Sequence, residues 1–161
     1  MALDRFGTYQ RQREALIAQH GWMVQGVFPT AEIPGSSFSY TIGLTDRDLP
    51  ELIQIGLPIE VGHTLLNDTA ALLQAQPDLL STLPLEYRHP NWPAPFTLVN
   101  ADAFKASDWA VQAWRRSHQT ARFVQVVWPD KHGHWPWELE CSEGVRTMQP
   151  LLTWPNPAQA S

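Results

Sequence analysis

Apolar residues recur every three to four positions in three stretches of the chain, the spacing that places them on one face of an α-helix. These stretches predict helices over about residues 5–20, 58–76 and 107–118. Asp4 and Ser107 stand where helix N-caps are expected, Pro58 suits a first helical position, and Gly21 suits a helix end. We therefore expect about three helices, with Val111 on the inner face of the third.

In other stretches apolar residues are continuous or alternate with polar residues, as in β-strands. Strands are predicted over residues 22–28, 38–44, 51–57, 96–100 and 123–128. Residues 129–133 have turn chemistry, so residues 134–141 are expected to return as a partner strand, with Pro136 confining it to an edge or a bulge. Short loops in the first half of the chain favour an antiparallel meander.

Strands and helices come in clusters rather than in strict alternation, which predicts an α+β fold. We expect a mostly antiparallel sheet, open or barrel-like, with about three helices packed on it. The chain has 161 residues, which fits a single domain. We place this domain at residues 1–149 and expect residues 150–161 to form an irregular tail.

The charge balance restricts the classes of partner that we expect, and the single cysteine restricts the cellular compartment. The net charge of −5, from 11 basic and 16 acidic residues, opposes binding to a phosphate backbone, and we expect no nucleic-acid partner. No apolar run reaches the roughly 20 residues of a membrane span, and the first residues do not resemble a secretory signal. Cys141 cannot form an internal disulfide, which fits a reducing compartment. We expect a cytoplasmic protein.

Chemistry is densest between Val127 and Glu138, which hold three of the eight tryptophans and two of the six histidines. Indole rings can wall a pocket, and imidazoles and carboxylates can move protons or hold metals. The residues that would form such a pocket are Trp128, Asp130, His132, His134, Trp135, Trp137 and Glu138. The alternative is a hairpin stapled by tryptophans, and it is favoured because buried indoles usually belong to the core.

Histidines at alternate positions of a strand share one face, so His132 and His134 raise the question of a metal site. His63 and His118 are possible distant ligands. However, the chain has no cysteine pair and no spacing typical of a known metal motif, and we assign no metal ligands.

A second informative segment runs from Phe38 to Leu44. Tyr40 is expected on its hydrophobic face, whereas Thr41 and Gly43 leave the other face low enough for a ligand to lie against the backbone. A helix packed on that face is the favoured alternative. With His63, which flanks the buried face of the second helix, Tyr40 and Thr41 complete the candidate binding residues. His89, in a proline-rich loop, is either the rim of an anion site or a solvated histidine.

Two short motifs resemble those of protein tyrosine phosphatases. The segment Trp128–Asp130 is similar to their acid loop, and Cys141–Arg146 is similar to their phosphate-binding loop. Only four residues separate the cysteine from the arginine here, where that family has five, and Glu140 replaces its histidine. A reactive thiolate needs a helix N-terminus after this loop to lower its pKa, but Arg146 is followed by Pro150 and not by a helix, so we interpret the similarity as coincidence.

Three blocks together resemble the bacterial family called domain of unknown function 4262. They are Phe38-Ser-Tyr-Thr-Ile-Gly-Leu44, Pro50-Glu-Leu-Ile-Gln-Ile-Gly-Leu-Pro58 and Gln125-Val-Val-Trp-Pro-Asp-Lys-His-Gly-His-Trp-Pro-Trp-Glu138. The family often carries Gly-His before Pro-Glu-Leu, where this chain has Asp48-Leu49. The resemblance covers about residues 21–138 and implies a small cytoplasmic bacterial protein, but it supplies no activity.

Two functions follow as hypotheses. The first is a binding or interaction module with an aromatic-walled pocket, because residues 87–96 and 128–137 are rich in aromatic residues and proline. Its partner would be a protein or a small molecule, and a homodimer is compatible with it. The alternative is a small-molecule enzyme that depends on a metal or on flavin, by analogy with flavin-binding split barrels. Hydroxyl groups stand near the corresponding phosphate positions, but no basic residue does, and the cofactor is left unknown.

Overall fold

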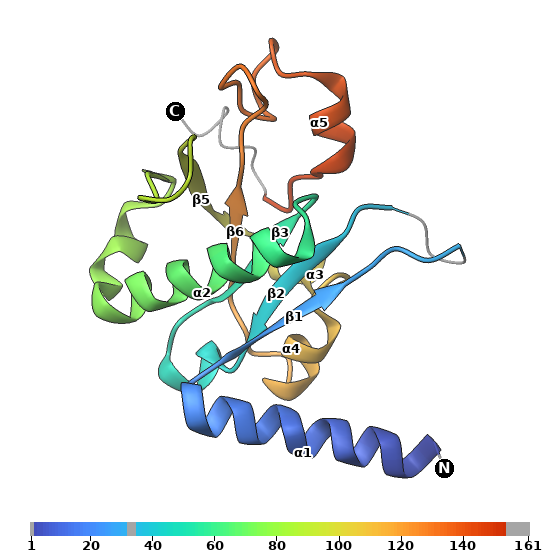
Figure 1. Cartoon of the computed structure of the whole chain (residues 1–161). Coiled ribbons are helices and arrows are strands. Elements are labelled where there is room, and N and C mark those ends of the chain that lie inside the picture. The colour runs from blue at the N-terminus through green and yellow to red at the C-terminus, as the bar shows by residue number, and fades with distance from the viewer. Residues whose placement is uncertain (1, 32–34, 154–161) are drawn as a thin grey trace.

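A mixed β-sheet forms the centre of the molecule (Figure 1). The computed structural model describes residues 2–31 and 35–153. Over these residues the sheet has six strands in the order β1-β2-β3-β6-β5-β4. Their bounds are β1 Met23–Val27, β2 Phe38–Ile42, β3 Glu51–Ile55, β4 Leu85–Tyr87, β5 Phe96–Ala101 and β6 Phe123–Val127.

Two antiparallel meanders make up this sheet. Strands β1, β2 and β3 form one, as the sequence predicts, and β4, β5 and β6 form the other. The central strands β3 and β6 join them in parallel, with Glu51 opposite Phe123. The predicted α+β class and the mostly antiparallel sheet are confirmed. The sheet is open, with β1 and β4 at its edges, so the barrel-like form is not adopted.

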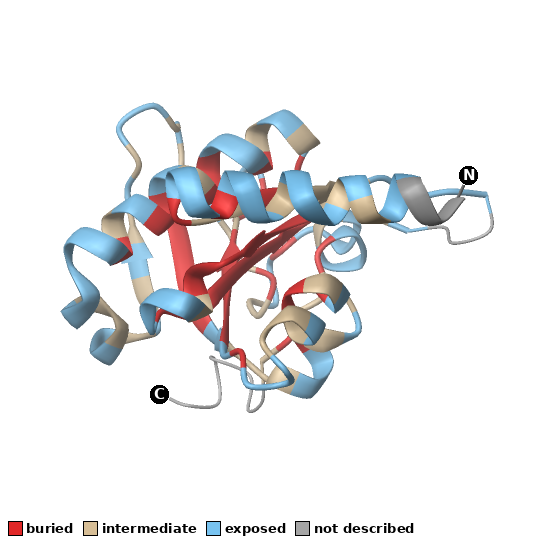
Figure 2. Cartoon of the chain, turned by 90° about the horizontal axis from the view of Figure 1, so that it is seen from below, coloured by how far each residue is buried: buried red, intermediate tan, exposed pale blue. Residues whose placement is uncertain are grey.

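Helices cover both faces of the sheet, which is therefore buried between them (Figure 2). The helical segments are α1 Ala2–His20, η1 Leu44–Arg47, α2 Ile59–Ala75, η2 Pro77–Thr82, α3 Ala103–Ser107, α4 Val111–Arg116 and α5 Glu143–Met148. In Figure 1, α2 crosses the front face, α3 and α4 lie behind it, and α1 lies below the sheet. None of the helices among the described residues is long and apolar enough to cross a membrane.

The face of β2 that carries Ser39 and Thr41 is covered by α2, as the favoured alternative predicts. Gly62 of α2 allows this close approach: a Cβ atom there would lie 2.3 Å from Nε2 of Gln54. The Gln54 amide in turn donates to Ser39 Oγ at 2.8 Å. Tyr40 points to the opposite face, where it is 2% exposed, so its predicted orientation is confirmed.

Several predicted boundaries are wrong. The first helix begins at Ala2, which places Asp4 inside the helix rather than at its N-cap. Two short helices, α3 and α4, replace the single helix expected from Ser107. The cap of α3 is Asp102, and three buried alanines rather than Val111 face the core.

Residues 150–153 have no regular secondary structure, although Leu152 is buried, and residues 154–161 lie outside the described part.

Candidate functional site

The segment after β6 is a compact loop held by one carboxylate, and the partner strand predicted over residues 134–141 is wrong. Asp130 Oδ1 accepts the backbone N–H groups of His132 and His134, both at 2.9 Å, and Oδ2 accepts that of Ser142 at 3.0 Å. These bonds, that from His134 first, lower the pKa of Asp130 below its usual value. The loop is therefore closed by a charged, buried carboxylate. A hairpin at this place would need backbone N–H groups that are free to bond between its strands.

The indoles of Trp128, Trp135 and Trp137 do not line a common pocket. Trp128 donates its Nε1–H to the carbonyl of Ile55 at 2.8 Å and packs against Gly56. Trp135 and Trp137 are half-buried and stack on each other, with ring centroids 5.4 Å apart. Cavities of about 270, 570, 760 and 880 Å³ occur on the described surface, and none of these four is lined by the three indoles.

The structure brings together two of the predicted polar residues and one that the sequence analysis missed. His134 Nδ1 lies 3.8 Å from Glu138 Oε2, and with Glu140 they offer three ligand atoms within 4.8 Å of one another. Glu138 Oε1 accepts the backbone N–H of Trp135 at 2.9 Å, which fixes the carboxylate. His132 is exposed in the turn and is not a member of this group.

Cys141 lacks the properties of a nucleophile. Its side chain is 5% exposed, and its Sγ donates to the carbonyl of Ser142 at 3.6 Å. Burial, followed by the nearby charge of Asp130, raises the pKa of the thiol above its usual value. A six-residue helix, α5, begins at Glu143 and contains Arg146, but no helix begins between Arg146 and Pro150, and the thiol is not activated. The similarity to tyrosine phosphatases therefore carries no chemistry.

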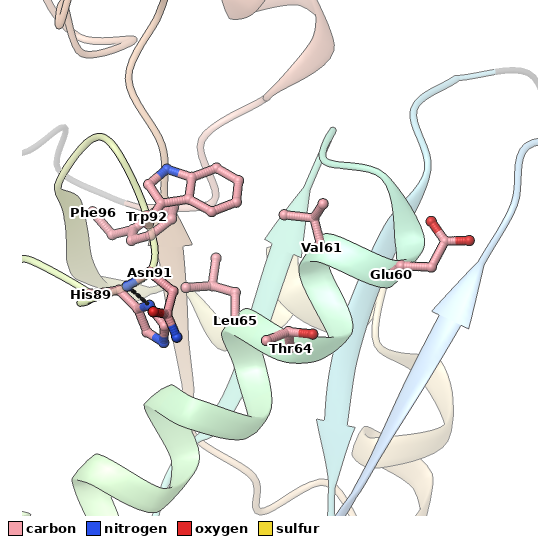
Figure 3. Close-up of a pocket in the computed structure, with 8 residues that line it drawn as sticks. All are labelled: Glu60, Val61, Thr64, Leu65, His89, Asn91, Trp92 and Phe96. Carbon is pink, nitrogen blue, oxygen red and sulfur yellow. Dashed lines mark hydrogen bonds between the residues drawn. The ribbon is translucent and has the colours of Figure 1, made fainter.

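An aromatic-walled pocket forms instead between α2 and the loop that joins β4 to β5 (Figure 3). We call it the Trp92 pocket; it has a volume of about 270 Å³. Its lining residues are Glu60, Val61, Thr64, Leu65, His89, Asn91, Trp92 and Phe96. Figure 3 shows Leu65 pointing towards Trp92, whereas Glu60 points away. The ring centroids of Trp92 and Phe96 are 5.1 Å apart, so two rings and aliphatic side chains form most of the wall.

His89 fixes the loop over this pocket. Its Nε2 lies 2.5 Å from Asp68 Oδ2 of α2, and its Nδ1 accepts the backbone N–H of Asn91 at 3.0 Å. The side chain of His89 is only 10% exposed, so it is not the solvated histidine considered above. Both ring nitrogens are hydrogen-bonded, so His89 holds the loop that carries Trp92. For the same reason His89 has no free nitrogen for proton transfer. The sequence signal was the aromatic, proline-rich segment, but nothing in it indicated Asp68 as the partner.

The remaining predicted residues lie apart from one another. Tyr40 lines the 880 Å³ cavity, and burial raises the pKa of its phenol to about 12. His63 is exposed and lines the 570 Å³ cavity beside Trp22. Thr41 is fully buried: its hydroxyl donates to Glu51 and accepts the N–H of Leu52, each at 2.8 Å. Tyr40, Thr41 and His63 therefore do not form one site with the loop after β6.

Comparison with known proteins identifies the family. The model of the family described as "Domain of unknown function (DUF4262)" matches residues 16–142, which is most of the chain. The chain therefore belongs to this family, and the resemblance noted in the sequence is confirmed. Neither a curated protein nor a solved structure matches the chain significantly.

Proposed function

We propose that this member of the DUF4262 family is a binding protein that takes a small, largely apolar molecule into the Trp92 pocket. The observation that carries the proposal is a preformed cavity walled by Trp92, Phe96 and Leu65 beside a loop fixed by His89. Ligand sites are typically concave and mostly apolar, with a few polar groups at fixed positions. Here Thr64 and Asn91 supply the polar groups at the rim.

The size of the pocket restricts the ligand. An engineered cavity of about 150 Å³ in another protein holds benzene, so 270 Å³ suits a ligand of one or two rings. A neutral ligand is favoured because His89 is already paired with Asp68 and Glu60 points away from the pocket. We include a cytoplasmic location in a bacterial cell in this proposal, supported by the lone cysteine and the family resemblance.

Titration with indole, followed by NMR of the Val61 and Leu65 methyl groups, tests the proposal. We expect saturable shifts at these methyls with a Kd on the order of 0.1–1 mM, the affinity that about nine heavy atoms can supply. Trp92→Ala should weaken binding at least tenfold, because it removes one wall. Trp137→Ala is the matched control, since Trp137 does not line the pocket, and it should bind indole as the parent does.

Two outcomes contradict this proposal. One is the absence of saturable methyl shifts up to the solubility of indole. The other is equal affinity in the parent and Trp92→Ala. If Trp92→Ala does not fold, Val61→Phe replaces it, because a larger side chain at that position fills the cavity. The Leu65 methyl groups of the folded variant should then show no shifts.

A second candidate function is metal binding by His134, Glu138 and Glu140, which would support the enzyme alternative. One imidazole and two carboxylates are suitable ligands for a transition metal and leave positions open for water. Elemental analysis of the purified protein tests it. We expect one equivalent of metal in the parent and none in Glu138→Ala, with Glu143→Ala as an exposed control. Equal metal content in all three proteins would exclude these ligands.

A further inference from the structure

The 880 Å³ cavity is a groove on the opposite side of the sheet from the Trp92 pocket, bordered by α1, α4 and the β1–β2 hairpin. We call it the Arg13 groove. Phe38 and Trp109 form its inner wall, edge to face with ring centroids 5.1 Å apart. Phe6 and Phe28 also line it, although 63% and 67% of their surfaces are exposed. The groove therefore offers aromatic surface that the rest of the described chain does not cover.

One buried polar group in this groove lacks a partner. The side chain of Arg13 is 12% exposed, and its Nε is buried without a hydrogen-bond acceptor among the described residues. Its Nη2 donates to Glu14 Oε1 at 3.2 Å. That carboxylate is already bound more closely by Arg116, at 2.9 and 3.0 Å. A buried N–H group without an acceptor costs about 1–3 kcal/mol, so Arg13 is disposed to accept an anion.

Charged residues also line the groove. Arg115 lines it, and its guanidinium has no ion pair within the described part of the chain. Arg116 is neutralised by Glu14 and Asp46, and Asp108 is the acidic residue of the lining. Together with Arg13, these guanidinium groups balance the charge of the three carboxylates around the groove. The preference for an anionic ligand therefore rests on the missing acceptor at Arg13 Nε, with Arg115 as a second cation beside it.

We propose that the Arg13 groove binds a small organic carboxylate with an aromatic body. A small rotation of the Arg13 side chain brings its buried Nε to the groove, where the carboxylate accepts hydrogen bonds from Nε and Nη. A guanidinium presents two parallel N–H groups that match two carboxylate oxygens. The aromatic body lies against Phe38 and Trp109. Binding completes the hydrogen bonding of the buried Nε and covers apolar surface in the same step. This site is separate from the Trp92 pocket and does not depend on the function proposed there.

Binding of 2-naphthoate, compared with the neutral isostere 2-naphthamide, tests this proposal by calorimetry on the full chain. The measurements use Val61→Phe as the parent protein, because its filled Trp92 pocket admits neither compound. We expect naphthoate to bind the parent at least tenfold more tightly than naphthamide. Arg13→Gln should remove this preference while naphthamide binding remains, which reports that the groove is intact. The matched control is Arg11→Gln, because Arg11 is on the same helix but does not line the groove. Trp92→Ala should leave naphthoate binding unchanged.

Equal binding of the two compounds to the parent would overturn the proposal, and so would equal losses in Arg13→Gln and Arg11→Gln. Should Arg13→Gln fail to fold, the parent itself provides the test. The ¹⁵N–¹H correlation of Arg13 Nε should shift on saturation with naphthoate and stay in place with naphthamide. An unchanged correlation with naphthoate would overturn the assignment of the carboxylate to this group.

Discussion

His89 Nε2 and Asp68 Oδ2 lie 2.5 Å apart and join the loop between β4 and β5 to helix α2. The contact spans 21 residues of sequence, so it fixes two segments that the chain does not hold together locally. The backbone N–H of Trp92 donates to the carbonyl of His89 at 3.1 Å, so Trp92 is held over the pocket. The shape of the pocket therefore depends on this pair.

Removal of the Asp68 carboxylate should loosen the loop. We expect Asp68→Ala to weaken indole binding about three- to tenfold, while the free energy of unfolding falls by about 1 kcal/mol, because Asp68 is 45% exposed. NMR titration and urea unfolding measure the two effects. Asp78→Ala, at an exposed position in η2, is the control and should change neither. Undiminished affinity in Asp68→Ala would show that the pair does not position Trp92.

Glu51 should contribute much more to stability. Glu51 is 1% exposed, and its carboxylate accepts five hydrogen bonds of 2.7–3.3 Å from Thr41, Gly43, Leu44 and Thr45. Glu51→Ala leaves these buried donors unpaired, so we expect a loss of about 3–5 kcal/mol in the free energy of unfolding. Urea denaturation measures it, with Glu86→Ala on the edge strand as the control. A loss below about 1 kcal/mol would contradict a structural role for this carboxylate.

The phenol of Tyr40 should ionise at a higher pH than an exposed tyrosine. Burial raises its pKa from 10.0 to about 12, so the folded state holds this proton more tightly than the unfolded state does. The resulting stability is fully present below pH 10 and is lost as the pH rises towards 12, on the order of 3 kcal/mol in all. Absorbance at 295 nm, compared between the parent and Tyr40→Phe, should place the missing transition near pH 12. A transition near pH 10 would contradict the burial of this ring.

Asp130 should make the loop after β6 sensitive to acid. Its pKa is lowered by backbone N–H bonds, so its contribution to stability is present above its ordinary pKa and is lost as the pH falls through the lowered value. We expect hydrogen exchange of the His132, His134 and Ser142 amides, corrected for the intrinsic pH effect, to lose protection in acid. Asp130→Asn should show reduced protection already at neutral pH. Protection that is independent of pH in the parent would contradict this account.

The local patterns of the sequence predicted much of the fold. The first meander and α2 follow from short-range periodicity, and both are confirmed. The parallel pairing of β3 with β6 is different, because it joins segments about 70 residues apart and leaves no local signal. The strand predicted over residues 134–141 failed for another reason. Its alternating pattern is suitable for a strand, but the side chain of Asp130 accepts the backbone N–H of His134, which strand pairing would use.

The candidate site was predicted less well than the fold. Aromatic density directed attention to Trp135 and Trp137, which stack on each other and do not line the Trp92 pocket. The pocket that exists depends on Trp92, Leu65 and the His89–Asp68 pair, which come from separate segments. Composition identifies residues capable of forming a wall, whereas only the packing of α2 against the β4–β5 loop decides which of them enclose a space.

Xenon binding to crystals of the protein tests the central claim most directly, because xenon enters preformed apolar cavities and needs no specific ligand chemistry. We predict a xenon atom between Trp92, Phe96 and Leu65 in the parent, and its absence in Val61→Phe crystals. A crystal structure in which the indole of Trp92 fills that space and xenon is excluded would contradict it.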